Sequence, residues 1–413
     1  MSQVDTEYGP VTEVRLNHPT HLPVYSKVHN YQRHPKEAPS VALLTGGSGA
    51  RNLAEELALL THNSAHILPM FDDGGSSREL RDRLRMPPPG DLRNRLMALS
   101  DMSMSGNPEV SKLFRTRLPR DADPADLGQR LEAFLGDDHP KMRSVEPRYR
   151  RIIQRHLLRF CREKPVGFDL RGGSLGNFVI AGAYLAMGDL ESVIFEFSQL
   201  AAARGEVFPV CAGADYHLKA ELVDGTEVIG QSRITTEEHS PIRRLAIVAP
   251  AGAHGAREEG PWIEVSPDLN PLAARSLGEA SVIGYAMGSF YTSLVPLLLV
   301  RGMGETIRQT KRPKVLVANL RRDPETPELR VTDMVLEICR YLRASDTVPG
   351  ETRDYINYVL VNSHGASEAD GLIPVDIGRM RDLGVEPIVL PVESATPGVH
   401  DAKLVAAVLM SLC

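Results

Sequence analysis

The stretch "VALLTGGSGARNLAEELALL", residues 41–60, decides the fold class. A short apolar run predicts a buried strand over Val41–Thr45, and a glycine turn follows it. Apolar residues then recur with helical spacing over Asn52–Leu60, and a second apolar run occupies Ala65–Phe71. Strand, glycine turn, helix and strand make a βαβ unit, which predicts an α/β fold with a mostly parallel sheet.

Later apolar runs extend this sheet. The candidate strands are Val282–Tyr285, Lys314–Ala318, Tyr358–Val361 and Pro387–Leu390, and helical patterns cover Thr332–Leu342 and Asp401–Leu412. The segment "AELVDGTEVIGQSRI" alternates around an Asp-Gly turn, which predicts a small antiparallel hairpin region. We therefore expect an N-terminal extension over residues 1–39 and an α/β domain over 40–413, with a helical insertion at about 105–170.

The insertion carries arginines spaced three and four residues apart. These are Arg148, Arg151, Arg155, Arg159 and Arg162, opposite Ile153, Leu157, Phe160 and Cys161. The pattern predicts an amphipathic helix whose basic face is either solvated or a lid that closes over phosphates.

Composition narrows the class of protein. Of 413 residues, 42% are hydrophobic and 24% are charged, as in soluble globular proteins. The net charge of −6 argues against nucleic-acid binding by bulk electrostatics. The four cysteines form no C-x-x-C pair, and no apolar run approaches the ~20 residues that span a bilayer. We therefore expect a cytoplasmic protein with neither a nucleic-acid partner nor membrane insertion.

The glycine turn "TGGSGARN" lies where a strand meets a helix. Such a turn lets the backbone approach a phosphate, and the helix N-terminus offers free N–H groups. The predicted ligand-binding residues here are Gly46, Gly47, Ser48 and Gly49. The stretch fits neither G-x-G-x-x-G nor a P-loop with its lysine, and a turn that serves only the fold stays possible.

The stretch "FDDGGSSREL", residues 71–80, ends the second strand with Asp72 and Asp73. Two adjacent carboxylates beside a phosphate site predict Mg²⁺ binding or a general base. A nicotinamide enzyme would explain one of them as a ribose-binding acid, and Asp73 alone could cap the next helix. The residues that follow as ligand-binding candidates are Gly74, Gly75, Ser76 and Ser77.

Three later segments place polar groups before helices. "MPPPGDLRNRLMAL" supplies Asp91, Arg93 and Asn94, "RGGSLGNFVIAGAYLA" supplies Ser174 and Asn177, and "AMGSFYTSLVPLLL" supplies Ser289, Tyr291 and Thr292. Each fits an anion-binding corner at the end of a parallel strand or helix. Ordinary helix caps and packing are the alternatives in each case.

The order of these motifs is more specific than any one of them. "TGGSG", "DDGGSS", "PPGDLRN", "GGSLGN", "GSFYTSLVPLLLVRG" and "VANL" (with Asn319) together resemble the superfamily of 2-phospho-L-lactate transferase (CofD) and YvcK-type gluconeogenesis factors. The resemblance implies a Rossmann-like fold with helices on both faces of the sheet. It also implies a nucleotide-linked ligand: a guanosine diphosphate conjugate used with Mg²⁺ in the transferase branch, and a UDP-sugar with a regulatory role in the YvcK branch.

We therefore expect an Mg-dependent transferase acting on a nucleotide-diphosphate conjugate. Asp72, Asp73 and Arg93 are the predicted catalytic residues, and Asp72 and Asp73 the metal ligands. The alternatives are a non-catalytic UDP-sugar-binding regulator of carbon metabolism and cell envelope, and an NAD-dependent oxidoreductase. We also expect a homo-oligomer. The loop Gly46–Gly49 departs from the G-G-G-T-G usual in YvcK-like chains, which predicts a different ligand.

Overall fold

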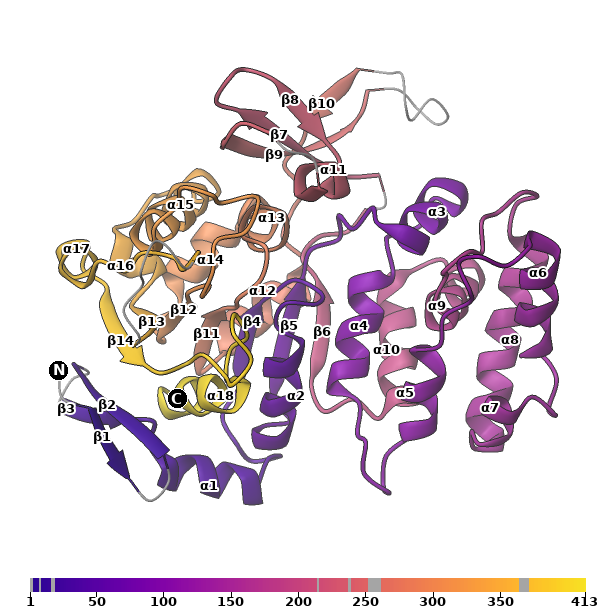
Figure 1. Ribbon diagram of the computed structural model, residues 1–413, viewed down its shortest axis with the longest axis horizontal. Coiled ribbons are helices and arrows are strands. Elements are labelled where there is room, and N and C mark those ends of the chain that lie inside the picture. Colours follow the sequence, from indigo (N-terminus) through magenta and orange to yellow (C-terminus); the bar gives the residue numbers. More distant parts are fainter. Residues whose placement is uncertain are drawn as a thin grey trace.

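A parallel sheet of seven strands runs through the centre of the computed structural model (Figure 1). Its order is β14-β13-β12-β11-β4-β5-β6, and all neighbouring strands are parallel. The strands are β4 (Val41–Leu44), β5 (Ser64–Leu68), β6 (Glu206–Pro209), β11 (Val282–Tyr285), β12 (Lys314–Val317), β13 (Tyr358–Asn362) and β14 (Glu386–Leu390). The structure describes residues 3–6, 9–15, 19–213, 215–236, 239–251, 261–363 and 371–413.

Helices cover both faces of the sheet because its strands are apolar on both sides. In β4, Val41 and Leu43 pack into one core cluster, whereas Ala42 and Leu44 pack into another on the opposite face. The first cluster includes α1 (Tyr25–Arg33), α2 (Arg51–Leu60) and α18 (Ala402–Ser411). The second includes α12 (Pro271–Glu279), α13 (Val295–Leu298), α14 (Met303–Gln309) and α15 (Val331–Ala344). The predicted α/β fold is confirmed, and burial on both faces explains the uninterrupted apolar runs.

A third group of helices continues the structure beyond β6. It comprises α3 (Gly75–Leu84), α4 (Gly90–Leu99), α5 (Pro108–Phe114), α6 (Pro124–Ala133), α7 (Pro140–Arg143), α8 (Pro147–Glu163), α9 (Leu175–Met187) and α10 (Leu190–Ala201). Helices α5 to α8 fall within the range predicted for the helical insertion. Among the helices of the described ranges, none is both long and apolar enough to cross a membrane.

Helix α8 has the predicted amphipathic character. Ile153, Leu157 and Phe160 are fully buried, and the five arginines on the other face are exposed. Arg155 pairs with Glu196 at 3.2 Å. In Figure 1, α8 lies at the end of the molecule away from β4 and β11, which favours the solvated-face interpretation over a lid.

The predicted hairpin belongs to a separate antiparallel sheet of order β10-β9-β7-β8. Its strands are β7 (His217–Leu222), β8 (Glu227–Ile229), β9 (Ile242–Pro250) and β10 (Trp262–Glu264), and α11 (Gln231–Thr236) follows β8. Gly225 occupies the turn with a φ of 87°, a conformation that suits glycine. The sheet stands at the top of Figure 1, with α11 between it and the main sheet.

The two ends of the chain meet beside α18. The N-terminal segment forms a three-stranded antiparallel sheet of β1 (Gln3–Thr6), β2 (Gly9–Arg15) and β3 (Pro19–Leu22). At the start of α1, the Val24 N–H donates to Ser411 Oγ at 2.8 Å, and Lys27 Nζ donates to the Cys413 carbonyl at 3.0 Å. These contacts join the N-terminal extension to the α/β domain.

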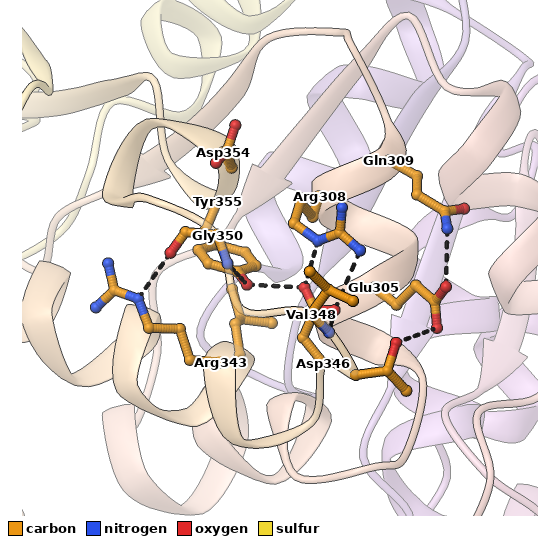
Figure 2. Close-up of polar contacts among 12 residues, drawn as sticks. Glu305, Arg308, Gln309, Arg343, Asp346, Val348, Gly350, Asp354 and Tyr355 are labelled. Atoms are coloured by element: carbon orange, nitrogen blue, oxygen red, sulfur yellow. Dashed lines mark hydrogen bonds and ion pairs between the residues drawn. The ribbon is translucent and has the colours of Figure 1, made fainter.

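A buried ion pair anchors the connection between α15 and β13, where α16 (Thr352–Tyr355) lies (Figure 2). Asp346 Oδ2 accepts hydrogen bonds from Arg308 Nε at 2.7 Å and from the Tyr355 hydroxyl at 2.8 Å. Burial alone would raise the pKa of Asp346, but these bonds and one from the Val348 N–H outweigh it and lower the pKa. The last helix of this region, α17 (Ile377–Asp382), precedes β14.

Candidate functional site

The strand order reverses between β4 and β11. From β4 the chain continues to β5 and β6 on one side, and from β11 it continues to β12, β13 and β14 on the other. The loops after β4 and β11 therefore diverge and open a crevice at the carboxyl ends of the strands. Open parallel α/β sheets bind their ligands at this kind of position.

The loop after β4 packs so closely against α4 and the loop after β11 that a side chain would clash at two of its glycines. A β-carbon on Gly47 would lie 1.7 Å from Asp91 Oδ1, and one on Gly49 would lie 2.7 Å from Gly288 Cα in the loop after β11. Ser48, between the two glycines, is exposed. The predicted glycine turn thus contacts both the carboxylate of α4 and the opposite rim of the crevice.

Arg95, a fully buried residue of α4, holds this loop in place. Its Nη2 donates to the Gly46 carbonyl at 2.7 Å and to Thr45 Oγ1 at 2.9 Å, and its Nη1 donates to the Ala50 carbonyl at 3.1 Å. Burial lowers the pKa of Arg95 to about 10, so the guanidinium stays charged at neutral pH. Sequence reasoning missed this residue, although it belongs to the "GDLRNRL" motif, and its charge adds positive potential beneath the loop.

Asn319 fixes the opposite rim. Its Nδ2 donates to the Gly288 carbonyl at 2.8 Å, and its Oδ1 accepts from the Gly288 N–H at 3.2 Å. Because the oxygen and the nitrogen of the Asn319 side chain both form hydrogen bonds with Gly288, Asn319 positions the loop before Ser289. Ser289 is half-buried and begins the π-helix η1 (Phe290–Leu294).

Glu325 was not predicted, yet it organises the start of η1. Its carboxylate accepts from the backbone N–H groups of Tyr291 and Thr292, each at 3.0 Å, and from the Thr292 hydroxyl at 2.5 Å. Burial raises the pKa of Glu325 although these bonds oppose the shift. Thr292, predicted to bind ligand, is therefore already engaged, and no local sequence pattern around "DPETPE" indicated this contact.

A cavity of about 360 Å³ occupies the crevice between the two loops. Its lining includes Gly49, Asn52, Ser289, Asn319, Arg322 and His400. Burial lowers the pKa of His400, whose Nε2 lies 3.0 Å from the Ala318 carbonyl oxygen, so the ring is neutral at physiological pH. Backbone N–H groups, an arginine and a neutral ring suit an anionic ligand with a polar head.

Two acidic side chains lie next to the glycine loop. Burial, and then the nearby Asp72 charge, raise the pKa of Asp91 to about 7. Burial also raises the pKa of Asp72, opposed by hydrogen bonds from Ser77 and from the Gly74 N–H, the latter at 3.0 Å. A β-carbon on Gly90 would lie 2.4 Å from Asp72 Oδ2, so glycine is required where the second carboxylate meets α4.

Asp73 faces a different element. Its Oδ1 accepts from the Ser232 N–H of α11 at 2.7 Å, and its backbone carbonyl accepts from Arg78 Nε at 2.8 Å. Exposed Gly75, with a φ of 48°, begins α3 two residues after Asp73. The shared metal role of Asp72 and Asp73 stays a prediction, and the described ranges contain no group of three or more His, Cys, Asp or Glu residues arranged for a metal.

Polar groups from α4 and α9 complete the surroundings of the carboxylates. Arg93 donates to Ser174 Oγ and, at 2.5 Å, to Asn94 Oδ1. Asn177 Nδ2 donates to Ser76 Oγ at 3.1 Å, whereas its Oδ1 is buried without a hydrogen-bond partner among the described residues. Burial, reinforced by neighbouring arginines, lowers the pKa of Arg93 to about 10, so it remains a cation beside Asp72 and Asp91.

Comparisons with known proteins agree with this architecture. The sequence profile of the family described as 2-phospho-L-lactate transferase CofD matches residues 41–392. The gluconeogenesis factor of Bacillus subtilis is 28% identical, over 91% of this chain and 98% of that protein. The gluconeogenesis factor of Halalkalibacterium halodurans is 28% identical, over 84% and 87%. A crystal structure of a UPF0052 family member from Bacillus halodurans superposes with a TM-score of 0.66 at 25% identity, covering 91% of this chain and 99% of that one.

Proposed function

Because the chain belongs to the family of 2-phospho-L-lactate transferase CofD, we propose that it is a transferase acting on a nucleotide-diphosphate-linked phosphorylated substrate. One observation carries the proposal: the carboxylates of Asp72 and Asp91 lie beside the glycine loop at the switch point of the sheet. The loop and the N-terminus of α2 suit a diphosphate, and the carboxylates suit proton transfer at the same place.

The chemistry follows from these positions. The oxygen of an acceptor hydroxyl bonds to phosphorus, a P–O bond of the diphosphate breaks, and a nucleoside monophosphate leaves. The hydroxyl proton passes to a carboxylate, and Asp91 suits this role because its pKa of about 7 leaves it part-ionised at neutral pH. Arg93, Asn94 and Asn177 would stabilise charge on the transferring group, and the unpaired Asn177 Oδ1 offers an acceptor to the substrate.

Mg²⁺ fits this donor set. The charge of Asp72 raises the pKa of Asp91, and that of Asp73 raises the pKa of Asp72; a cation between the carboxylates and the substrate phosphates would relieve this repulsion. Asp72 would hold the ion together with Asp91, and Asp73 would join them once its bond to Ser232 opens. Bound Mg²⁺ would neutralise charge on the diphosphate.

Titration of guanosine- and uridine-diphosphate conjugates by calorimetry, with and without Mg²⁺, tests the proposal. We expect wild type to bind more tightly with Mg²⁺, and Asp72→Asn and Asp91→Asn to lose that gain. Asp126→Asn in α6 serves as a control, because its solvent-accessible carboxylate pairs with Arg130 on the same helix, away from the crevice. Equal binding by all four proteins, with no effect of the metal, would refute the metal-and-base role.

A non-catalytic UDP-sugar-binding regulator is the second candidate. It is supported by relatives that are named gluconeogenesis factors rather than enzymes. Mass spectrometry of a mixture incubated for hours with UDP-GlcNAc and with a guanosine diphosphate conjugate distinguishes the two. Tight UDP-GlcNAc binding without release of any nucleoside monophosphate would favour the regulator.

A further inference from the structure

A second cavity lies between α3 and the small antiparallel sheet. Its volume is about 570 Å³, and its walls come from α3, β7, β8, β10 and α11. It shares no lining residue with the cavity in the crevice. In Figure 1, α3 lies beside α11 below the small sheet, where two separately built parts of the chain meet. Ligand sites in proteins occur preferentially at such junctions and have volumes of roughly 300–1,000 Å³.

One wall of this cavity is an uncharged ring surface. Trp262 of β10, the only tryptophan of the chain, meets His217 of β7 edge to face with ring centroids 4.8 Å apart. Both side chains are half-buried. Burial, together with the charges of Arg81 and Arg78, lowers the pKa of His217 to about 3, so the imidazole is neutral throughout the physiological range.

The facing wall contains an exposed arginine, Arg85. Arg85 ends α3 in the left-handed conformation, with φ 53° and ψ 46°. This conformation costs a residue other than glycine on the order of 1 kcal/mol. The Arg85 side chain is exposed, and its guanidinium forms no hydrogen bond or ion pair within the described ranges. Arg78, by contrast, donates to Ser232 Oγ at 2.6 Å and to the Asp73 carbonyl.

We propose that this cavity binds a small ligand that combines a planar aromatic ring with an anionic group. The ring would pack against Trp262 and His217, and the anionic group would pair with the guanidinium of Arg85. The cavity shares no lining residue with the crevice, although Asp73, one of the predicted metal ligands, also lines it.

The full-length protein allows a direct test, because its single tryptophan reports on this cavity alone. The probe is 1-anilinonaphthalene-8-sulfonate, an aromatic anion that accepts energy from excited tryptophan. We expect saturable quenching of Trp262 emission at one probe per chain. Quenching that does not saturate would overturn the proposal.

Two variants separate recognition of the anion from recognition of the ring. Arg85→Gln should weaken binding of the sulfonate at least fivefold, because it removes a charge-assisted contact. The matched control is Arg83→Gln, since Arg83 lies on the same helix, contacts the Val166 carbonyl and does not line the cavity. N-phenyl-1-naphthylamine, which has the same rings without the sulfonate, should bind Arg85→Gln and wild type equally. Equal sulfonate affinities of the Arg85 and Arg83 variants would show that Arg85 recognises no anion.

Discussion

Replacing Gly47 by alanine tests whether the contact between the glycine loop and Asp91 is needed for activity. The added β-carbon would lie 1.7 Å from Asp91 Oδ1 and 2.3 Å from its Cγ. An ordinary contact between such atoms is about 3.5–4 Å, so one of the two groups must move by roughly 2 Å. Arg95 ties the loop carbonyls, so the carboxylate of Asp91 is the group that moves.

The substitution should affect the transfer rate much more than the stability of the protein. Overpacking of a buried contact costs about 1–3 kcal/mol, which is less than the roughly 5–15 kcal/mol stability of a typical domain, so the variant should stay folded. A catalytic group misplaced by about 1 Å can lose on the order of a hundredfold in rate. We therefore expect Gly47→Ala to lower the transfer rate about a hundredfold while the unfolding temperature falls by only a few degrees.

Gly128→Ala is the control. Gly128 lies within α6 with no neighbouring atom near its added β-carbon, so alanine should stabilise the helix by about 0.5–1 kcal/mol. Circular dichroism gives the unfolding temperatures, and release of nucleoside monophosphate gives the rates. If Gly47→Ala reacts as fast as Gly128→Ala, the loop does not position the reacting groups and the reasoning fails.

Three further changes have expected outcomes. Because its pKa is raised, Asp91 stays protonated in the folded state at pH values where it is ionised in the unfolded state. The free energy of unfolding of wild type should therefore decrease as the pH rises from about 4 to about 7, and Asp91→Asn should flatten this pH profile in urea titrations. Arg308→Met leaves the Asp346 carboxylate without its cation and should lower the urea midpoint of unfolding at pH 7. That deficit should shrink as pH falls through the lowered pKa of Asp346, and a pH-independent deficit would contradict the ion-pair explanation. Glu325→Gln removes one hydrogen-bond acceptor at the start of η1 and should lower the free energy of unfolding by about 1–3 kcal/mol. It should also weaken nucleotide binding in calorimetry. An unchanged affinity would show that Glu325 does not contribute to ligand binding in the crevice.

The fold could be predicted from the sequence because its signals are local. Continuous apolar runs at residues 41–44 and 282–285 identify strands buried on both faces, and the Asp-Gly turn at 224–225 identifies the hairpin. The order of the strands in the sheet could not be predicted in the same way, because it depends on which strands and helices from distant parts of the chain pack together. That order brings the loop after β4 against the loop after β11, more than 200 residues later in the chain.

The same division applies to the candidate site. Asp72, Asp73 and the glycine turn are visible in the sequence because they directly follow apolar strands, and Asp91 because it follows three prolines at the start of a helix. Only the tertiary structure decided that Asp72 lies near Asp91 while Asp73 accepts from the Ser232 N–H, because α4 and α11 come from other parts of the chain. The sequence by itself thus predicted neither Arg95 nor Glu325, but it predicted several of the residues that we propose carry the chemistry. Their pairing and raised pKa values arise from burial and from contacts between distant segments, which no local pattern contains.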